Sequence, residues 1–332
     1  MIRKSNVIGM AILSIAIRGD FAQSQSPLPT TLVIDLQNVV EYQSDIGDPQ
    51  KFATNPNLTP SVVYKNFGVA TLLADIVAVN GQPAKGLYAG RSRSIVASVA
   101  PSAGGAIADV TRTAIREHIF EILKIDGTPV GTIISLGFSG GPPPPGTPSA
   151  ERANWAIVGG TGAFLGARGQ VGGTGGLARA ASMAEDPINR RTYGGGAYSI
   201  IIHVIPMSVP QIVNTANGPA VVHSSDFTPV SASRPAAGGE LISLFATGLG
   251  PTVPQVDPGQ SFPANPLAAV NSPVTVTVNG KPAEVLAAVG YPGSVDGYQI
   301  NVRVPPNTAK GLATIQVGAA WIAGAPVSIA VQ

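Results

Sequence analysis

The glycine-rich segment Trp155–Gly169, WAIVGGTGAFLGARG, constrains the fold of this chain more than any other stretch. An apolar strand that runs into glycines can open a dinucleotide-binding unit or form a tight turn between β-strands. Gly159 and Gly162 fit the first alternative, but position 165 is leucine and the next glycine arrives one residue late. That alternative also needs a helix, which the GGTGG run at 172–176 disfavours. The segment therefore predicts a β-turn, and we expect no cofactor.

The first two-thirds of the chain reads as a series of short strands. With 40 glycines, 30 prolines and only 11% charged residues, the composition favours many turns and few exposed helices. Side chains of alternating character recur at even spacing, which is typical of a closed antiparallel barrel of seven or eight strands. Besides the strand in the opening segment, the predicted strands are 31–42, 67–79, 85–93, 115–125, 131–138 and 198–205.

A second domain begins near Pro206, where the sequence becomes polar and rich in proline. Short strands separated by Pro-rich and Gly-rich turns follow, among them 240–249, 274–278, 284–289, 298–304, 313–317 and 327–331. This pattern predicts a β-sandwich of roughly one hundred residues. We therefore divide the chain into a signal peptide (1–24), a barrel (25–206) and a sandwich (207–332).

The N-terminus has the pattern of an export signal. A basic start with Arg3 and Lys4 precedes the apolar stretch Val7–Ile17 and the small residues around Ala22. The alternative, a retained anchor, is disfavoured because eleven apolar residues are too few to span a bilayer. Removal of residues 1–24 leaves a net charge near zero and no basic run, so nucleic acid is not an expected partner. The absence of cysteine excludes disulfides and thiolate chemistry.

Two further motifs do not support catalysis or metal binding. The GFSGG sequence at 137–141 matches the spacing of a nucleophile elbow, but four prolines stand where the elbow needs a helix. The three histidines, His118, His203 and His223, are dispersed along the chain, and two of them lie in apolar strands. Such histidines are more often satisfied core residues than ligands, so no metal site is expected.

With those alternatives excluded, Ile157–Gly169 resembles the VGGTGxFxxARG segment of plant dirigent proteins, which are relatives of the allene oxide cyclases. The resemblance extends over roughly residues 28–206 and includes Asp35 in the first strand and Phe67-Gly68 before the second. It implies an eight-stranded calycin-like barrel with an apolar interior, often assembled as a homotrimer. Dirigent proteins steer the coupling of phenolic radicals made by a separate oxidase, and the cyclases orient a fatty-acid epoxide for ring closure.

The resemblance also implies candidate site residues. Asp35 matches the first-strand aspartate of the family and Arg168 matches the arginine of the motif, so both are catalytic candidates, although either could be structural. Ala163 stands where some members carry an acidic residue. The remaining pocket or motif candidates are Tyr42, Glu117, Glu121, Gly159, Gly160, Gly162 and Phe164.

The C-terminal residues resemble a domain of exported acidobacterial (Solibacter-type) proteins. The matching stretches are GELISLFATGLGP (239–251), VTVTVNGKPAEV (274–285) and YQINVRVP (298–305). This resemblance implies an immunoglobulin-like fold with a structural or adhesive role, and no activity follows from such a fold.

These observations lead to one principal hypothesis and two alternatives. The first is a secreted, cell-surface or periplasmic bacterial protein whose barrel binds a small apolar molecule, phenolic or lipid-like, with the capacity to steer its coupling or cyclisation. Its further partners would be a separate oxidase or a component of the cell envelope. The second is a non-catalytic extracellular scaffold. The third is a true cyclase or isomerase, which would require paired acidic or basic groups inside the barrel.

Overall fold

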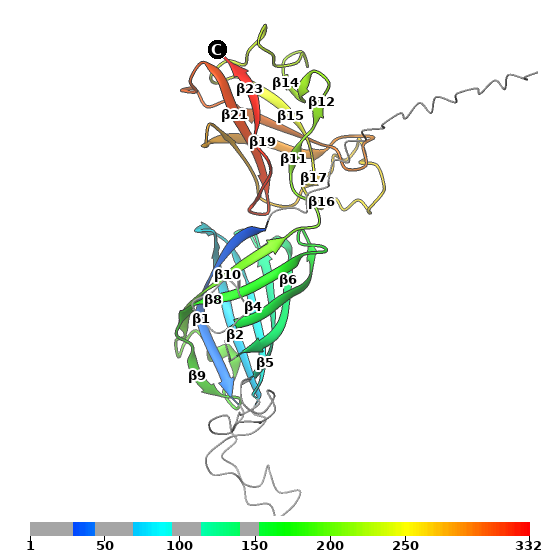
Figure 1. Ribbon diagram of the computed structural model, residues 1–332. Coiled ribbons are helices and arrows are strands. Elements are labelled where there is room, and N and C mark those ends of the chain that lie inside the picture. Colours follow the sequence, from blue (N-terminus) through cyan, green and yellow to red (C-terminus); the bar gives the residue numbers. More distant parts are fainter. Residues whose placement is uncertain (1–28, 44–68, 95–113, 140–152) are drawn as a thin grey trace, which may run out of the picture.

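The computed structural model describes residues 29–43, 69–94, 114–139 and 153–332, which form two β-domains (Figure 1). In the first domain, eight strands pair antiparallel in the order β2-β4-β5-β6-β7-β8-β10-β1. The sheet closes because β1 also pairs with β2. The predicted eight-stranded antiparallel barrel is thus confirmed. Its strands are β1 (Thr30–Gln43), β2 (Val69–Val79), β4 (Lys85–Ser94), β5 (Ala114–Leu123), β6 (Pro129–Ser139), β7 (Ala153–Gly162), β8 (Arg168–Gly176) and β10 (Gly196–Ile205).

One side of the barrel wall carries an additional layer. The short strand β3 (Gln82–Pro83) pairs antiparallel with the end of β2, and β9 (Arg179–Ser182) pairs in parallel with the end of β1. Next comes the 3-10 helix η2 (Pro187–Asn189). Arg190 and Arg191 then bind the Asp75 carboxylate on β2 at 2.6 and 3.1 Å, which fastens this segment to the outer face of the wall.

A bulge in β1 decides which side chains enter the barrel. In the first half of β1, Leu32, Ile34 and Leu36 face inward and are buried. Asn38 has a φ of 53°, and the register with β2 slips between Gln37 and Val40. One extra residue reverses the alternation of a strand. Glu41 consequently lies opposite inward-facing Leu72, so it points into the barrel.

The glycine-rich segment forms the turn between β7 and β8, as predicted. Gly162 has a φ of 60°, a conformation that favours glycine, and the chain then folds Phe164 into the core with 1% of its side chain exposed. A Cβ at Gly131 would lie 3.1 Å from the Phe164 ring, and one at Gly160 would overlap the Phe164 backbone. Gly160 of this motif and Gly131 on β6 therefore make room for a core side chain.

The C-terminal domain is a strongly curled sheet that resembles half a barrel. Its principal path runs β11-β15-β20-β19-β18-β21-β22, and its core is formed by alternating side chains such as Tyr298, Ile300 and Val302. The larger strands are β15 (Leu241–Thr247), β18 (Val274–Val278), β19 (Lys281–Gly290), β20 (Tyr298–Arg303), β21 (Gly311–Ala319) and β23 (Val327–Val331). The shorter ones are β11 (Gln211–Ile212), β12 (Asn214–Thr215), β13 (Gly218–Pro219), β14 (Val221–His223), β16 (Thr252–Val253), β17 (Ala269–Val270) and β22 (Ile322–Ala323).

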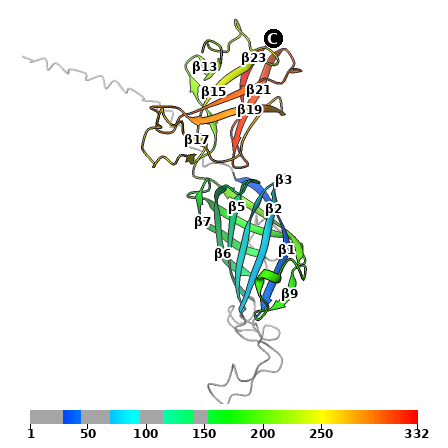
Figure 2. The same ribbon diagram turned by 180° about the vertical axis from the view of Figure 1, so that it is seen from behind.

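This domain sits on one end of the barrel, as both ribbon views show (Figures 1 and 2). The turn between β21 and β22 reaches the barrel, where Ala320 and Ile322 are each 3% exposed and belong to the barrel's own apolar core. The Asn271 amide also donates a hydrogen bond to the Pro129 carbonyl at 2.5 Å. We call this the covered end of the barrel and the opposite end the distal end.

Candidate functional site

The distal half of the barrel interior contains polar side chains on four neighbouring strands. Strand register places them in two adjacent rows that follow the barrel wall. The row nearer the distal end contains Ser92, Arg116, Gly137 and Trp155, on β4 to β7. The row nearer the covered end contains Gly90, His118 and Ser135, on β4 to β6. Toward the covered end the next row is apolar, with Phe120 and Ile133. The barrel is therefore polar at one depth and apolar beyond it.

Tyr88 and His118 form a buried hydrogen bond in this cluster. The Tyr88 hydroxyl lies 2.7 Å from His118 Nδ1, and the His118 ring is 1% exposed. Gly90 gives these two groups their space, because a Cβ there would lie 2.9 Å from the hydroxyl and 3.3 Å from Nδ1. The His118 ring also packs on Trp155, with 4.4 Å between ring centroids. The imidazole is thus held in place from several sides.

The surroundings fix the protonation state of His118. Burial, assisted by the positive charge of Arg116, lowers its pKa from 6.5 to about 3, so the ring is neutral at pH 7. Burial likewise raises the pKa of Tyr88, which keeps its proton. If the Tyr88 hydroxyl donates to Nδ1, only the Nε2–H of His118 is left without a partner in the pair. In the other tautomer Nδ1–H donates to the Tyr88 oxygen, which leaves both the Tyr88 O–H and His118 Nε2 without one. We therefore assign the proton to Nε2.

Arg116 brings a positive charge into the same space. Its guanidinium carbon lies 5.8 Å from the centre of the Trp155 ring, a cation–π distance, and Gly137 between the two strands leaves room for this approach. The Arg116 Nε atom is buried and has no hydrogen-bond partner among the described residues. None of the carboxylates in those residues forms an ion pair with Arg116.

Three buried polar atoms of the cluster therefore lack partners within the described part of the chain: Arg116 Nε, His118 Nε2 and Ser135 Oγ. An unsatisfied buried polar group costs about 1–3 kcal/mol, so native proteins rarely keep several together without a purpose. Arg116 Nε can only donate, His118 Nε2 donates in the assigned tautomer, and the serine hydroxyl can also donate. Glu41 adds a negative charge near Tyr88, whose pKa it helps to raise. The arrangement can hold an oxygen acceptor.

The two catalytic candidates from the sequence lie elsewhere. Asp35 is on the outer face of β1, where it accepts a hydrogen bond from Ser199 Oγ at 2.7 Å. Arg168 is exposed at the start of β8, opposite Ile205. Asp35 pairs with a residue six positions away from Ile205 on β10, and six residues of strand span about 20 Å. The structure does not bring these two residues together.

The other candidates divide between the outer wall and the turn. Glu117 and Glu121 are exposed on the outer face of β5, and the β1 bulge turns Tyr42 outward, toward the segment that carries Glu185. Gly159, Gly160 and Gly162 shape the turn, and Phe164 fills the covered end of the core. The interior site therefore includes none of the residues chosen from the family resemblance.

The sequence did contain a signal for the interior site. The alternation of β5 predicts that Arg116, His118, Phe120 and Ile122 share one face, and this is the face that the structure buries. A strand in which arginine and histidine share a face with two large apolar residues predicts polar groups inside an apolar barrel. Which face points inward depends on long-range pairing, and this could not be read from the strand alone.

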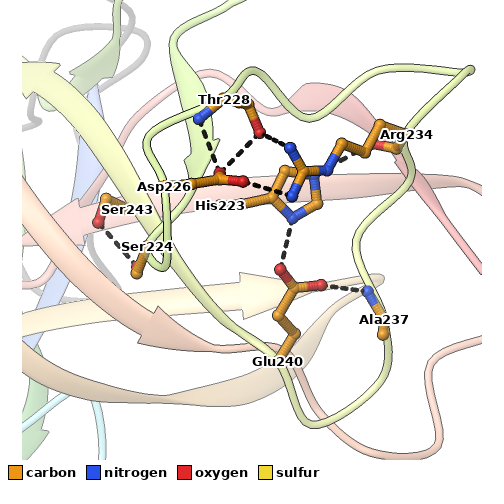
Figure 3. Close-up of polar contacts among 8 residues, drawn as sticks. All are labelled: His223, Ser224, Asp226, Thr228, Arg234, Ala237, Glu240 and Ser243. Atoms are coloured by element: carbon orange, nitrogen blue, oxygen red, sulfur yellow. Dashed lines mark hydrogen bonds and ion pairs between the residues drawn. The ribbon is translucent and has the colours of Figure 1, made fainter.

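A second polar cluster lies in the C-terminal domain and has a different character (Figure 3). His223 Nδ1 contacts the Glu240 carboxylate, and its Nε2 lies 3.2 Å from the Arg234 carbonyl oxygen. Each ring nitrogen therefore has a protein oxygen as its partner. The Arg234 guanidinium in turn binds Asp226 at 2.6 Å and also contacts Thr228. This cluster closes the loop between β14 and β15, and no ring atom of His223 remains for a ligand.

Comparisons with known proteins give no further assignment: no family profile, no curated protein and no solved structure matches the chain. Searches within the described ranges also found no group of three or more metal-ligating side chains and no helix long and apolar enough to cross a membrane.

Proposed function

We propose that the barrel binds a small, largely apolar organic molecule in its distal half and holds it in one orientation. One observation carries the proposal: Arg116, His118 and Ser135 lie on neighbouring strands of the barrel interior, and each has a buried polar atom with no partner among the described residues. A scaffold with no ligand would gain stability by filling these positions with apolar side chains. Barrels of eight strands are of a size that can be filled by side chains or hold one small ligand.

The finer identity of the domains belongs to the same proposal. The glycine-rich turn and the order of the strands support a barrel of the dirigent and allene oxide cyclase type, and the curled second sheet is compatible with an immunoglobulin-like accessory domain. Export to the cell surface, the periplasm or the medium follows from the expected signal at 1–24, which lies outside the described residues. Exposed Ile119, Leu136 and Val158 on β5 to β7 would suit contacts between copies in a homotrimer.

A catalytic role is a second candidate, and the presence of two opposite charges inside the barrel favours it. Glu41 and Arg116 both face the interior, and the neutral His118 and protonated Tyr88 lie beside them. Such groups could stabilise charge that develops during a cyclisation or a coupling, while confinement supplies the orientation. Orientation alone can contribute about 7–11 kcal/mol to a rate. The non-catalytic scaffold remains the competing function.

Ligand binding can be tested with the intrinsic fluorescence of the barrel. The chain has two tryptophans, and the variant Trp321→Phe leaves Trp155 in the candidate site as the reporter. We expect small phenols, substituted benzenes or medium-chain lipids to change its emission saturably. If no member of this panel changes the emission or the melting temperature, the scaffold function is the correct one.

A further inference from the structure

We infer that the natural ligand carries a carboxylate, which Arg116, His118 and Ser135 bind inside the barrel. This inference rests on the proposed ligand-binding function and specifies the chemistry of its polar group. It follows from three properties of the site: the kind of hydrogen-bonding atom left free, the sign of the local charge and the depth at which these atoms lie.

The free atoms are donors. Arg116 Nε–H can only donate, and the Tyr88 hydroxyl occupies Nδ1 of His118, which leaves Nε2–H as the second donor. Ser135 lies opposite His118 in the β5–β6 register, so its hydroxyl adjoins the same space. Two or three donors on neighbouring residues match the two oxygens of a carboxylate, each of which accepts more than one hydrogen bond. An alcohol or an ether offers a single oxygen to these donors.

The local charge favours an anion. Arg116 is cationic and has no ion-pair partner among the described residues. Its charge lowers the pKa of His118 and opposes the rise that burial gives to the pKa of Tyr88. Glu41 on β1 acts on Tyr88 but forms no ion pair with Arg116. A cation whose Nε atom is buried favours a nearby anion. A ligand carboxylate would supply that counter-charge.

The depth of the site limits what else could bind. His118 and Ser135 are 1% and 0% exposed, so a ligand that reaches them leaves water behind. The rings of Trp155 and Phe120 flank this depth, and the apolar rows of the barrel continue beyond it. An inorganic anion would satisfy the donors but would leave the apolar wall without a partner. An organic acid with an apolar body satisfies both.

The test is a matched series of probes on the full chain carrying Trp321→Phe: benzoate, benzyl alcohol and toluene, titrated against Trp155 fluorescence. These molecules share a ring and differ in the polar group. We expect benzoate to bind about tenfold to a hundredfold more tightly than benzyl alcohol, since a hydrogen bond to a charged group contributes more than a neutral one. Equal affinity for the acid and the alcohol would overturn the carboxylate assignment and leave ligand binding intact. If none of the three binds, the proposed function itself fails.

Variants then locate the carboxylate. Arg116→Gln should abolish the preference for benzoate, while Arg116→Lys, which keeps the charge, should retain part of it. Arg91→Gln is the matched control, because Arg91 is exposed on the outer wall of β4, and it should leave both affinities unchanged. His118→Gln keeps a donor and checks the second contact. Circular dichroism confirms that each variant is folded, and an unchanged preference in folded Arg116→Gln would refute the assignment.

Discussion

The Tyr88–His118 pair gives a sharp test of whether the barrel interior is kept polar at the expense of stability. Tyr88→Phe removes the hydroxyl that lies 2.7 Å from Nδ1 and leaves a buried imidazole with neither nitrogen bonded. His118→Leu, a substitution of similar volume, leaves the Tyr88 hydroxyl without its partner. Each single change should lower the free energy of unfolding by about 1–3 kcal/mol, the cost of a buried polar group left unsatisfied.

The double variant should behave differently from the sum of the two. With both groups replaced, no polar atom of the pair remains, and the orphaned His118 Nε2 is removed as well. Replacement of both partners by apolar groups can be nearly neutral, so we expect a coupling energy of about 2–3 kcal/mol in favour of the double variant. The same variant should lose affinity for any ligand that contacts His118.

Urea unfolding measures this cycle directly. In the Trp321→Phe background, Trp155 lies against His118 and reports the barrel transition alone. The slope of free energy against urea must be equal in all four proteins for the comparison to hold. Additive losses, with a coupling energy below about 0.5 kcal/mol, would show that the pair is not an isolated buried hydrogen bond and would refute the reasoning.

Four further outcomes are expected. The pKa of His118 is lowered to about 3 in the folded barrel, so the unfolded chain binds the proton at a higher pH than the folded chain does. The free energy of unfolding should therefore fall by about 1.4 kcal/mol per pH unit as the pH drops from about 6.5 toward 3. This slope should be smaller in His118→Leu. Asp75→Asn should cost about 3 kcal/mol and speed tryptic cleavage after Arg190, since it breaks a largely buried ion pair. Ile322→Ala should destabilise the barrel by about 2–5 kcal/mol, seen in the Trp155 transition although the residue belongs to the other domain. Asp35→Ala should leave the affinity for benzoate unchanged, because Asp35 is on the outer wall, and an altered affinity would restore it as a site residue.

The sequence predicted the barrel well because its signals are local. Turns such as Asn80-Gly81 and the alternation of β5 are set by neighbouring residues. Strand pairing then closes the sheet and buries the apolar faces. The number and direction of the strands therefore followed from patterns a few residues long.

The candidate site was predicted less well, since its residues meet only through pairing of distant strands. Arg116 and Trp155 are 39 positions apart in sequence and approach across β6 because residue 137 is glycine. Family resemblance pointed instead to Asp35 in the first strand and to Arg168 in the glycine-rich motif, and the structure places these two residues far apart on the barrel. The sequence of β1 contains no local pattern that predicts the bulge at Asn38, so it could not predict that Glu41 points into the barrel.

That bulge means that the chemistry inside the barrel is set by a count of residues as well as by their identity. With a regular strand, Tyr42 would enter the barrel and Glu41 would stay in the outer wall; the single extra residue exchanges an aromatic ring for a carboxylate. A deletion at position 38 would thus change the interior charge without replacing either side chain. In any comparison of related sequences, a one-residue gap at this point would carry more meaning for ligand preference than most substitutions nearby.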